Sequence, residues 1–155
     1  MTTPTLHATP ELVAEAWLKT IVGDIVATTL PKPGSTGALS WADTGFVTLV
    51  TAGGSPNLYV PLRTPVMGIT CWAANPTSQK PPWRKASNLA ESIVAACQDH
   101  PNVPKVSLAL PGGYPRVQVK SAYVTGDPRR IPDDVSSYAR YDIPGLVIAW
   151  TEVPS

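Results

Sequence analysis

Residues Phe46–Ala73, FVTLVTAGGSPNLYVPLRTPVMGITCWA, hold two apolar runs on either side of a polar insert rich in glycine and proline. The runs, Phe46–Thr51 and Val66–Ala73, are rich in β-branched and aromatic residues and are therefore predicted to be strands. The second run is apolar on both faces, as in a strand covered on both sides, so we expect it at the centre of a sheet. The insert, Ala52–Pro65, is too long for a tight hairpin turn, and loops of about a dozen residues or more are commonly functional or disordered.

The composition indicates one globular domain with little surface charge. The chain has 155 residues, enough for a single domain with a buried core. Hydrophobic residues make up 43% of it and charged residues only 15%, against about 25% in a typical protein. A surface poor in charge is easily desolvated against a partner, although a surface rich in threonine, serine and proline would give the same composition. The net charge of +1 provides no long-range field to attract nucleic acid or a membrane.

Cysteine usage and hydropathy favour a reducing, aqueous compartment. The two cysteines, Cys71 and Cys97, do not make a disulfide framework, and we predict buried free thiols rather than a bridge. No apolar run approaches ~18 residues, so no membrane span is expected. The first residues, MTTPTLHATPEL, lack the basic start and apolar stretch of a signal peptide. We therefore expect a protein that is made and used in the cytosol.

Two amphipathic helices are predicted from their boundary signals and apolar stripes. The first follows the N-cap residue Thr9 and covers Pro10–Val22, after which Gly23 offers a left-handed cap. The second begins near Pro82 and ends near Asp99. Each helix carries a tryptophan as a large apolar anchor, so we expect both helices to cover one face of the sheet.

The remaining apolar runs complete an α+β fold: a mixed, mostly antiparallel β-sheet with two helices packed on one face and two long inserts. Further strands are predicted at Ile25–Leu30, Val106–Leu110, Val117–Thr125 and Leu146–Val153. Alternation in the third of these places Val117, Val119 and Tyr123 on one face. The eight side chains expected to anchor the core are Trp17, Met67, Ile69, Trp72, Trp83, Ile93, Ile148 and Trp150.

Three segments lie outside this predicted core. Met1–Ala8 forms an N-terminal arm, and Ala52–Pro65 and Gly126–Pro144 form the two inserts. Trp41, in a loop between the first short strand and the central pair, is expected to be exposed or half-buried. The whole chain, residues 1–155, is treated as a single domain.

The residue types that carry catalysis are sparse and poorly placed. His7 and His100 lie on the arm and at a helix end, with no nucleophile beside either in the sequence, and no Cys/His pair has zinc-finger spacing. Asp133 and Asp134 could hold a metal ion, but a solvated pair of loop carboxylates is the simpler interpretation. Arg129-Arg130 followed by these two acids could form a local ion-pair network or a clamp between subunits. We expect no enzymatic activity, no cofactor and no metal.

The order of the predicted elements resembles that of the tail terminator proteins of long-tailed bacteriophages, in the variety found in actinobacteriophages, which have the lambda-type terminator fold. The resemblance covers about Thr9–Val153. It is sharpest in three stretches: FVTLVTAGG at 46–54, LRTPVMGITCWA at 62–73, and VTGDPRR at 124–130. These are compositional patterns in a fixed order rather than catalytic signatures.

The resemblance implies a structural virion protein at the head-proximal end of the tail, assembled in the host cytoplasm without contact with a membrane. Copies would form a homohexameric ring that caps the tail tube protein, ends its polymerisation and meets the head-side neck, or stopper, protein. Such a ring allows genomic DNA to pass through its lumen without sequence-specific binding. A closed ring needs two different patches on each copy. The candidate interface residues, taken mainly from the two inserts, are Asn57, Tyr59, Arg63, Arg129, Arg130, Asp133, Asp134 and Arg140.

Two alternatives remain open at the level of sequence. The chain could be another head–tail joining protein or a tail-tube protein of the same virion, which would polymerise rather than stop at one ring. It could instead be a small ligand-binding domain or enzyme, which would need a pocket with converging polar groups and a perturbed titratable residue. The four arginines in the candidate set could likewise serve only in local pairs.

Overall fold

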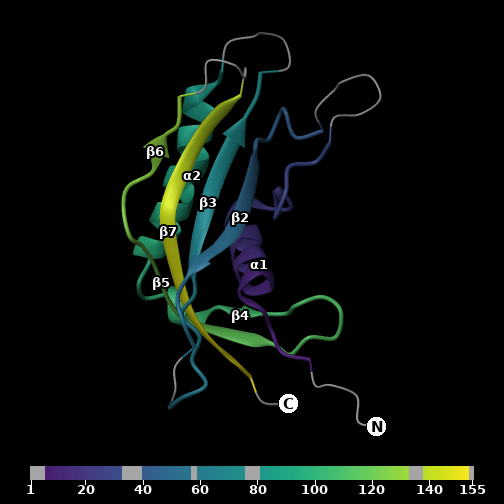
Figure 1. The fold of residues 1–155 in the computed structure, drawn as a ribbon, viewed down its shortest axis with the longest axis vertical. Coiled ribbons are helices and arrows are strands. Elements are labelled where there is room, and N and C mark those ends of the chain that lie inside the picture. Colours follow the sequence, from purple (N-terminus) through teal and green to yellow (C-terminus); the bar gives the residue numbers. More distant parts are fainter. Residues whose placement is uncertain (1–5, 33–39, 57–58, 76–80, 133–137, 154–155) are drawn as a thin grey trace.

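The computed structural model describes residues 6–32, 40–56, 59–75, 81–132 and 138–153. Within them a curled sheet has the strand order β1-β2-β3-β7-β5-β4, and β6 pairs with β7 (Figure 1). The β1–β2 pair is parallel and the other pairs are antiparallel. The predicted α+β class with a mixed, mostly antiparallel sheet is therefore confirmed. The strands are β1 Val26–Ala27, β2 Phe46–Gly53, β3 Val66–Ala73, β4 Ser107–Leu108, β5 Val117–Val124, β6 Arg129–Arg130 and β7 Ala139–Glu152.

Helix α1 spans Pro10–Val22, as the sequence predicts. The Thr9 hydroxyl accepts a hydrogen bond from the Leu12 amide at 3.3 Å, which satisfies one of the amides left open at a helix start. At the other end Gly23 adopts φ +84°, and its amide donates to the Lys19 carbonyl at 3.0 Å. Local capping signals therefore set both ends of this helix.

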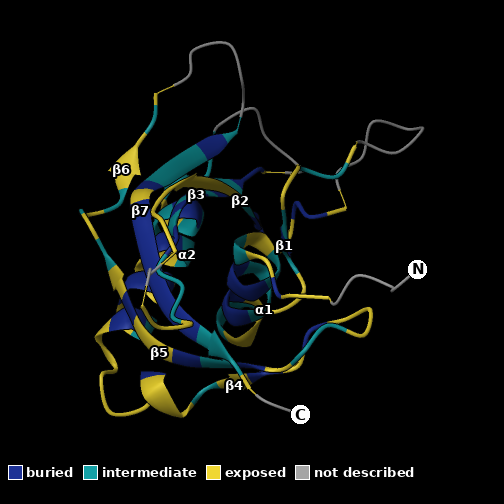
Figure 2. Cartoon of the chain, turned by 60° about the horizontal axis from the view of Figure 1, so that its bottom comes forward, coloured by how far each residue is buried: buried dark blue, intermediate teal, exposed yellow. Residues whose placement is uncertain are grey.

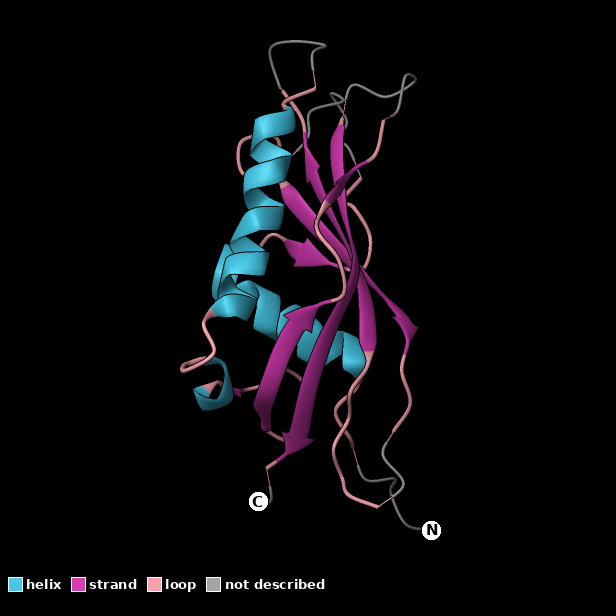
Figure 3. Cartoon of the chain, turned by 90° about the vertical axis from the view of Figure 1, so that its left-hand side faces the viewer, coloured by secondary structure: helices cyan, strands magenta, loops and turns pink. Residues whose placement is uncertain are grey.

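Helix α2 spans Trp83–Gln98 and buries one stripe of small and aliphatic side chains. The stripe is Ala86, Ala90, Ile93, Val94 and Cys97. Both helices lie within the curve of the sheet, on the same side of it (Figures 2 and 3). The expectation that both helices cover one face is confirmed. Neither helix is long and apolar enough to cross a membrane, within the residues that the structure describes.

Strand β3 lies in the middle of the sheet, between β2 and β7, as predicted. Its burial alternates: the side chains toward the helices, such as Met67 and Ile69, are buried, and those on the outer face are half-buried. The prediction of a strand covered equally on both sides is thus wrong, because the helices cover only one face. Trp72 lies on the outer face, where its indole N–H donates to the Thr48 hydroxyl at 3.0 Å.

Strand β7 begins seven residues earlier than predicted, at Ala139 rather than Leu146. Residues 139–144 therefore belong to the sheet and not to an insert, and β6 also lies inside the predicted insert. Pro144 sits where the β3–β7 register shifts, between the pairs Met67↔Leu146 and Ile69↔Ile143. A bulge tolerates proline because the extra residue is left out of the hydrogen-bond ladder. Pro144 thus marks a bulge within the strand.

A second bulge changes the faces of β5. The register shifts between the pairs Val119↔Trp150 and Ser121↔Ala149, which leaves Lys120 as the extra residue. Beyond it the alternation reverses, so that Ala122 is buried and Tyr123 is 53% exposed. The predicted shared face of Val117, Val119 and Tyr123 is therefore wrong at Tyr123.

Smaller corrections concern the edges of the fold. The first strand is only Val26–Ala27, and β4 is only Ser107–Leu108, preceded by a short 3-10 turn at Val103–Lys105. Trp41, expected to be exposed or half-buried, is 3% exposed. It packs edge-on against Tyr138, with ring centroids 5.3 Å apart, in a small cluster on the outer side of the sheet.

The eight anchor residues fall into two groups. Six are almost fully buried in the main core, at 0–2% exposure: Trp17, Met67, Ile69, Ile93, Ile148 and Trp150. The other two, Trp72 and Trp83, are half-buried and carry arginine side chains on their rings. The expected anchors thus include two tryptophans that belong to the surface.

Candidate assembly interface

The two long connections leave the sheet at opposite ends. The β2–β3 connection leaves near the end where the chain termini lie, and the β6–β7 connection leaves at the other end (Figure 1). Of the candidate interface residues in these connections, Asn57, Asp133 and Asp134 lie outside the described residues. The rest can be placed, and three of the four arginines rest on tryptophan rings.

The β2–β3 connection presents an apolar pair of residues to solvent. Tyr59 is 94% exposed and Val60 is 49% exposed, which makes Tyr59 the most exposed large hydrophobic side chain in the described part of the chain. Single exposed apolar side chains are common on any protein surface, but tyrosine is a residue type enriched at protein interfaces. This placement is compatible with the role expected for Tyr59.

Arg63 is held against β7 by its backbone. Its amide and carbonyl exchange two hydrogen bonds of 2.9 Å with Trp150, and its guanidinium carbon lies 5.5 Å from the centre of the Trp150 ring. The last part of the connection therefore continues the line of β3 along the sheet. The Arg63 side chain serves a contact within the subunit that sequence spacing does not reveal, because Trp150 lies 87 positions further along the chain.

Arg140 lies on the outer face of the sheet, between an aromatic ring and a carboxylate. Its guanidinium carbon is 5.3 Å from the centre of the Trp72 ring, and its Nε donates to Asp142 at 3.2 Å. Cation–π and ion-pair contacts together hold the side chain in one position. Arg140 thus has local partners and is a weaker candidate for an intersubunit contact.

Arg129 and Arg130 form β6, beside the first turn of α2. The Arg130 guanidinium stacks on Trp83 at 3.9 Å from the ring centre, and both arginines are exposed. Arg129 faces Asp142 in the register, but the Asp142 carboxylate is bonded to Arg140. The Arg129 side chain forms no hydrogen bond or ion pair with the residues that the structure describes. Asp133 and Asp134, the acidic half of the predicted network or clamp, lie outside those residues.

The N-terminal arm is tied to the end of β7 by one carboxylate. Glu152 accepts a hydrogen bond from the Ala8 amide at 2.7 Å, and its other oxygen lies 3.2 Å from His7 Nδ1. His100 is exposed at the end of α2. Sequence reasoning missed the contact because it joins residues 145 positions apart. Neither histidine is placed beside a nucleophile in the described residues, which also contain no cluster of metal-ligating side chains.

The clear pKa shifts in the described chain fall on the two thiols. Burial, together with the nearby Asp142 carboxylate, raises the pKa of Cys71 to about 12, and burial raises that of Cys97 to about 11. Both cysteines are free and buried, as predicted. A raised pKa keeps the thiol protonated, which makes it a poor nucleophile.

At pH 8 both thiols are expected to resist alkylation in the folded protein and to react fully in denaturant. The pKa values of both thiols in the folded protein exceed the ordinary thiol value of 9.0. Above about pH 9 the unfolded state therefore loses its thiol protons first, and stability falls as pH rises. Iodoacetamide labelling followed by mass spectrometry would check the first point, and denaturation midpoints at pH 8 and 10.5 the second. Rapid labelling of the native protein would contradict the burial of these thiols.

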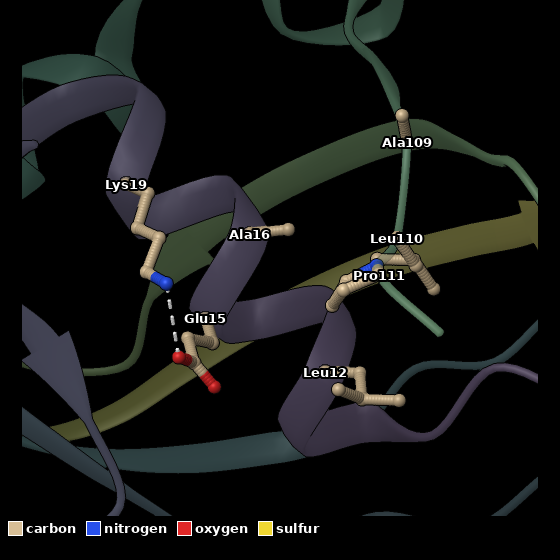
Figure 4. A pocket seen from close by; sticks show the side chains of 7 residues that line it. All are labelled: Leu12, Glu15, Ala16, Lys19, Ala109, Leu110 and Pro111. Atoms are coloured by element: carbon tan, nitrogen blue, oxygen red, sulfur yellow. Dashed lines mark ion pairs between the residues drawn. The ribbon is translucent and has the colours of Figure 1, made fainter. Parts of the chain in front are cut away.

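A groove of about 440 Å³ lies between α1 and residues 109–111 (Figure 4). Its apolar lining includes Leu12, Ala16 and Leu110. The charged residues at its edge, Glu15 and Lys19, pair with each other at 3.2 Å across one helical turn. Because these charges satisfy each other, the groove offers an apolar surface rather than a set of converging reactive groups.

No family model matches the chain, and no curated protein sequence matches it. Among solved structures, a chain described as part of the "Virion of native gene transfer agent (GTA) particle" is similar, with a TM-score of 0.49 and 15% sequence identity. The similarity covers 92% of this chain and 90% of that one. At these values it assigns neither a family nor a function to this chain.

Proposed function

We propose that this chain is a structural virion protein, and specifically a tail terminator whose copies form a ring on the end of the tail tube. The observation that supports the role most directly is the departure of the two long connections from opposite ends of one sheet. A terminator must contact a tube on one side and a neck protein on the other, and a subunit with a contact loop at each end suits that task. The sequence resemblance to tail terminators over residues 9–153, in which three stretches follow one another in the same order, favours the same role.

The chemistry of the described residues favours a role in binding other proteins over a role in catalysis. The thiols are made less reactive by burial, and the groove charges pair with each other. Exposed groups such as Tyr59 and the arginines of β6 are residue types enriched at protein interfaces. An interface between ring subunits is expected to bury on the order of 1,000 Å² or more.

The proposed function is tested by adding the purified full chain to tail-tube protein that is polymerising. Tube lengths measured by electron microscopy should stop increasing, because a ring on the growing end blocks the next addition. Heat-unfolded chain is the control and should leave the lengths unchanged. Tubes that keep growing, or that incorporate the chain along their length, would overturn the proposal and favour a tube protein.

Arg129→Ala is expected to leave stability within about 0.5 kcal/mol of the natural chain, because exposed side chains contribute little to folding. Binding to the neighbour at the β6–β7 end of the sheet, tube or neck protein, should weaken, because the exposed arginine is free to contact a partner. Lys120→Ala, at an exposed position of β5, is the matched control and should bind both partners normally. Equal binding of the two variants to tubes and to neck protein would remove Arg129 from the interface.

Arg63→Ala is expected to preserve the fold, because the pairing with Trp150 uses the backbone of residue 63. Loss of the guanidinium over the Trp150 ring should lower the free energy of unfolding by about 0.5–1 kcal/mol. Denaturant unfolding of the variant measures this. If docking to tubes also weakens, the side chain serves both contacts; unchanged docking would limit Arg63 to its local role.

A further inference from the structure

We propose that copies of this chain join side by side through the open edges of their sheets, with β2 of one copy pairing antiparallel with β5 of the next. The inference deepens the proposed function and rests on it for the existence of a ring, whereas the joint itself is argued from the sheet of this chain alone. Each copy contributes two different edges, so the contact runs head to tail, as a closed ring requires.

Strand β2 has an open edge over its second half. It pairs with β3 on one side, and on the other side β1 covers only Val47 and Thr48. The Val47 amide donates to the Ile25 carbonyl at 2.8 Å, so it points away from β3. Backbone groups alternate in direction along a strand, and the N–H and C=O of Thr51 therefore also point away from β3. Thr51 lies beyond β1, and on this side the described residues offer its backbone no partner.

Strand β5 has an open edge of the same kind. It pairs with β7 on one side, and on the other side β4 covers only Val117 and Gln118. The Thr125 amide donates to the carbonyl of Gly145 in β7 at 2.8 Å, so it points toward β7. By the same alternation, the N–H and C=O of Val124 point away from β7. No backbone group in the described part of the chain meets them there.

The two open edges match in height and in direction. Two adjacent rows of paired residues cross β2, β3, β7 and β5 in that order: Thr51, Met67, Leu146 and Val124 on one, and Gly53, Val66, Val147 and Tyr123 on the next. Because the four strands alternate in direction, β2 and β5 run in opposite directions. A second copy placed beside the first, with no shift along the strands, therefore brings Thr51 opposite Val124. Both residues point their N–H and C=O at the joint, which allows two N–H···O bonds.

The side chains along these edges also suit a contact between copies. Val50 is 60% exposed and Tyr123 is 53% exposed, and both lie on the outer face, because they pair with outer-face positions of β3 and β7. Across the joint Tyr123 would stand opposite Gly53, which leaves room for its ring, and within diagonal reach of Val50. The facing stretches, residues 49–53 and 121–124, contain no charged residue, so the joint buries no charge.

A second copy fits these edges better than an unrelated extended peptide. Each open stretch is short, since a bulge follows Thr51 in β2 and another lies at Lys120 in β5. A single added strand would therefore gain few hydrogen bonds, and short, bulged edges resist such pairing. In a ring the same contact is repeated at every joint, and each copy is held at both of its edges. We accordingly expect isolated pairs of copies to bind weakly and the closed ring to be the stable form.

The joint is tested by disulfide trapping in the full chain that carries both Gly53→Cys and Tyr123→Cys. The two positions lie on opposite edges of one copy and meet only between copies, and a Cβ at Gly53 has no heavy atom within 4 Å. With a mild oxidant, at high protein concentration and on tail tubes, we expect a ladder of linked copies that ends at the closed ring. The natural thiols are buried and free. The matched control combines Gly53→Cys with Glu91→Cys, on the exposed face of α2, and should give no ladder beyond dimers.

Proline variants in the same two-cysteine chain test the direction of the backbone groups. Thr51→Pro removes an N–H that points at the joint, so the chain should fold and the yield of the ladder should fall by about fivefold, the factor for one hydrogen bond. Val50→Pro is the contrast, because the N–H of residue 50 points toward β3, and its loss should destabilise the fold itself. Circular dichroism of both variants measures folding separately from linking.

The outcomes separate the joint from the proposed function. Tubes that are capped by the chain while no ladder exceeds the control would overturn the joint alone. A ladder from a chain that does not cap tubes would refute the proposed function alone, and the absence of both would refute both. A ladder that folded Thr51→Pro leaves unchanged would also overturn the strand pairing. If Thr51→Pro fails to fold, the trapping result decides.

Discussion

Trp17→Ala is expected to lower the free energy of unfolding by ~3–5 kcal/mol, the usual cost of truncating a large buried aromatic side chain. Trp17 is 2% exposed and sits in the main core between α1 and the sheet. Much of the cost comes from the cavity that the surrounding side chains cannot fill. Urea unfolding followed by circular dichroism measures the change.

Trp83→Ala is the matched comparison, because it removes the same side chain from a half-buried site. Its ring supports Arg130 and Tyr141 at the surface, so the expected loss is ~1–2 kcal/mol from partial burial and the cation–π contact. The sequence alone predicts equal costs for the two tryptophans. Equal measured losses would contradict the division into core and surface tryptophans described here.

Gly54→Ala is expected to lower the free energy of unfolding by about 2–4 kcal/mol, through backbone strain and overpacking together. Gly54 has φ +89°, a conformation that disfavours any Cβ. An added Cβ would also lie 2.6 Å from the Thr64 carbonyl oxygen and 2.9 Å from Pro65 Cα, which are backbone atoms. The start and end of the β2–β3 connection would have to separate.

Gly23→Ala isolates the conformational part of that cost. Gly23 has φ +84°, and a Cβ there would meet no heavy atom within 4 Å. The expected loss is about 1–3 kcal/mol, from the backbone conformation alone, because φ +84° with ψ −162° is essentially confined to glycine. Thermal unfolding of both variants measures the difference. A Gly54→Ala protein no less stable than Gly23→Ala would show that the two ends of the connection are not in contact.

Local sequence signals were sufficient to predict where the two helices and the central strand β3 lie in the chain. Thr9, Pro10 and Gly23 define α1 through their own backbone preferences and hydrogen bonds. The apolar run of β3 likewise predicted a strand and its central place in the sheet, but not its one-sided burial, because that burial depends on where the helices pack. In such segments the information lies within a few residues, and no distant partner is needed to interpret it.

The long strand β7 could not be predicted in full, because its start carries a loop-like residue. Pro144 has no amide N–H to donate to a strand ladder. From the sequence alone, it therefore indicates the end of a loop rather than the interior of a strand. It is accommodated because β7 bulges there against β3, and the Gly145 carbonyl accepts from the Thr125 amide at 2.8 Å. The bulge depends on the register of three strands, which no local pattern encodes. The same reason explains the reversed face of Tyr123 in β5.

For the candidate interface, the sequence predicted which residues could take part but not which residues they contact. Arginine-rich inserts were recognisable, but the sequence could not show that Arg130 stacks on Trp83 or that Arg63 pairs with Trp150. These partners lie tens of residues apart, and only the folded sheet brings them together. The structure therefore distinguishes Arg129 from Arg63 and Arg140. Arg129 has no side-chain partner among the described residues, whereas Arg63 lies over the Trp150 ring and Arg140 pairs with Asp142.

The mass of the particles that this chain forms tests its proposed role most directly. Light scattering on the purified full chain, alone and after mixing with isolated tail tubes, gives the number of copies in each particle. We expect a monomer or a single closed ring alone, and tubes heavier by one ring, six copies if the likeness to tail terminators holds. Filaments that lengthen with concentration, or tubes whose mass does not change, would contradict the account.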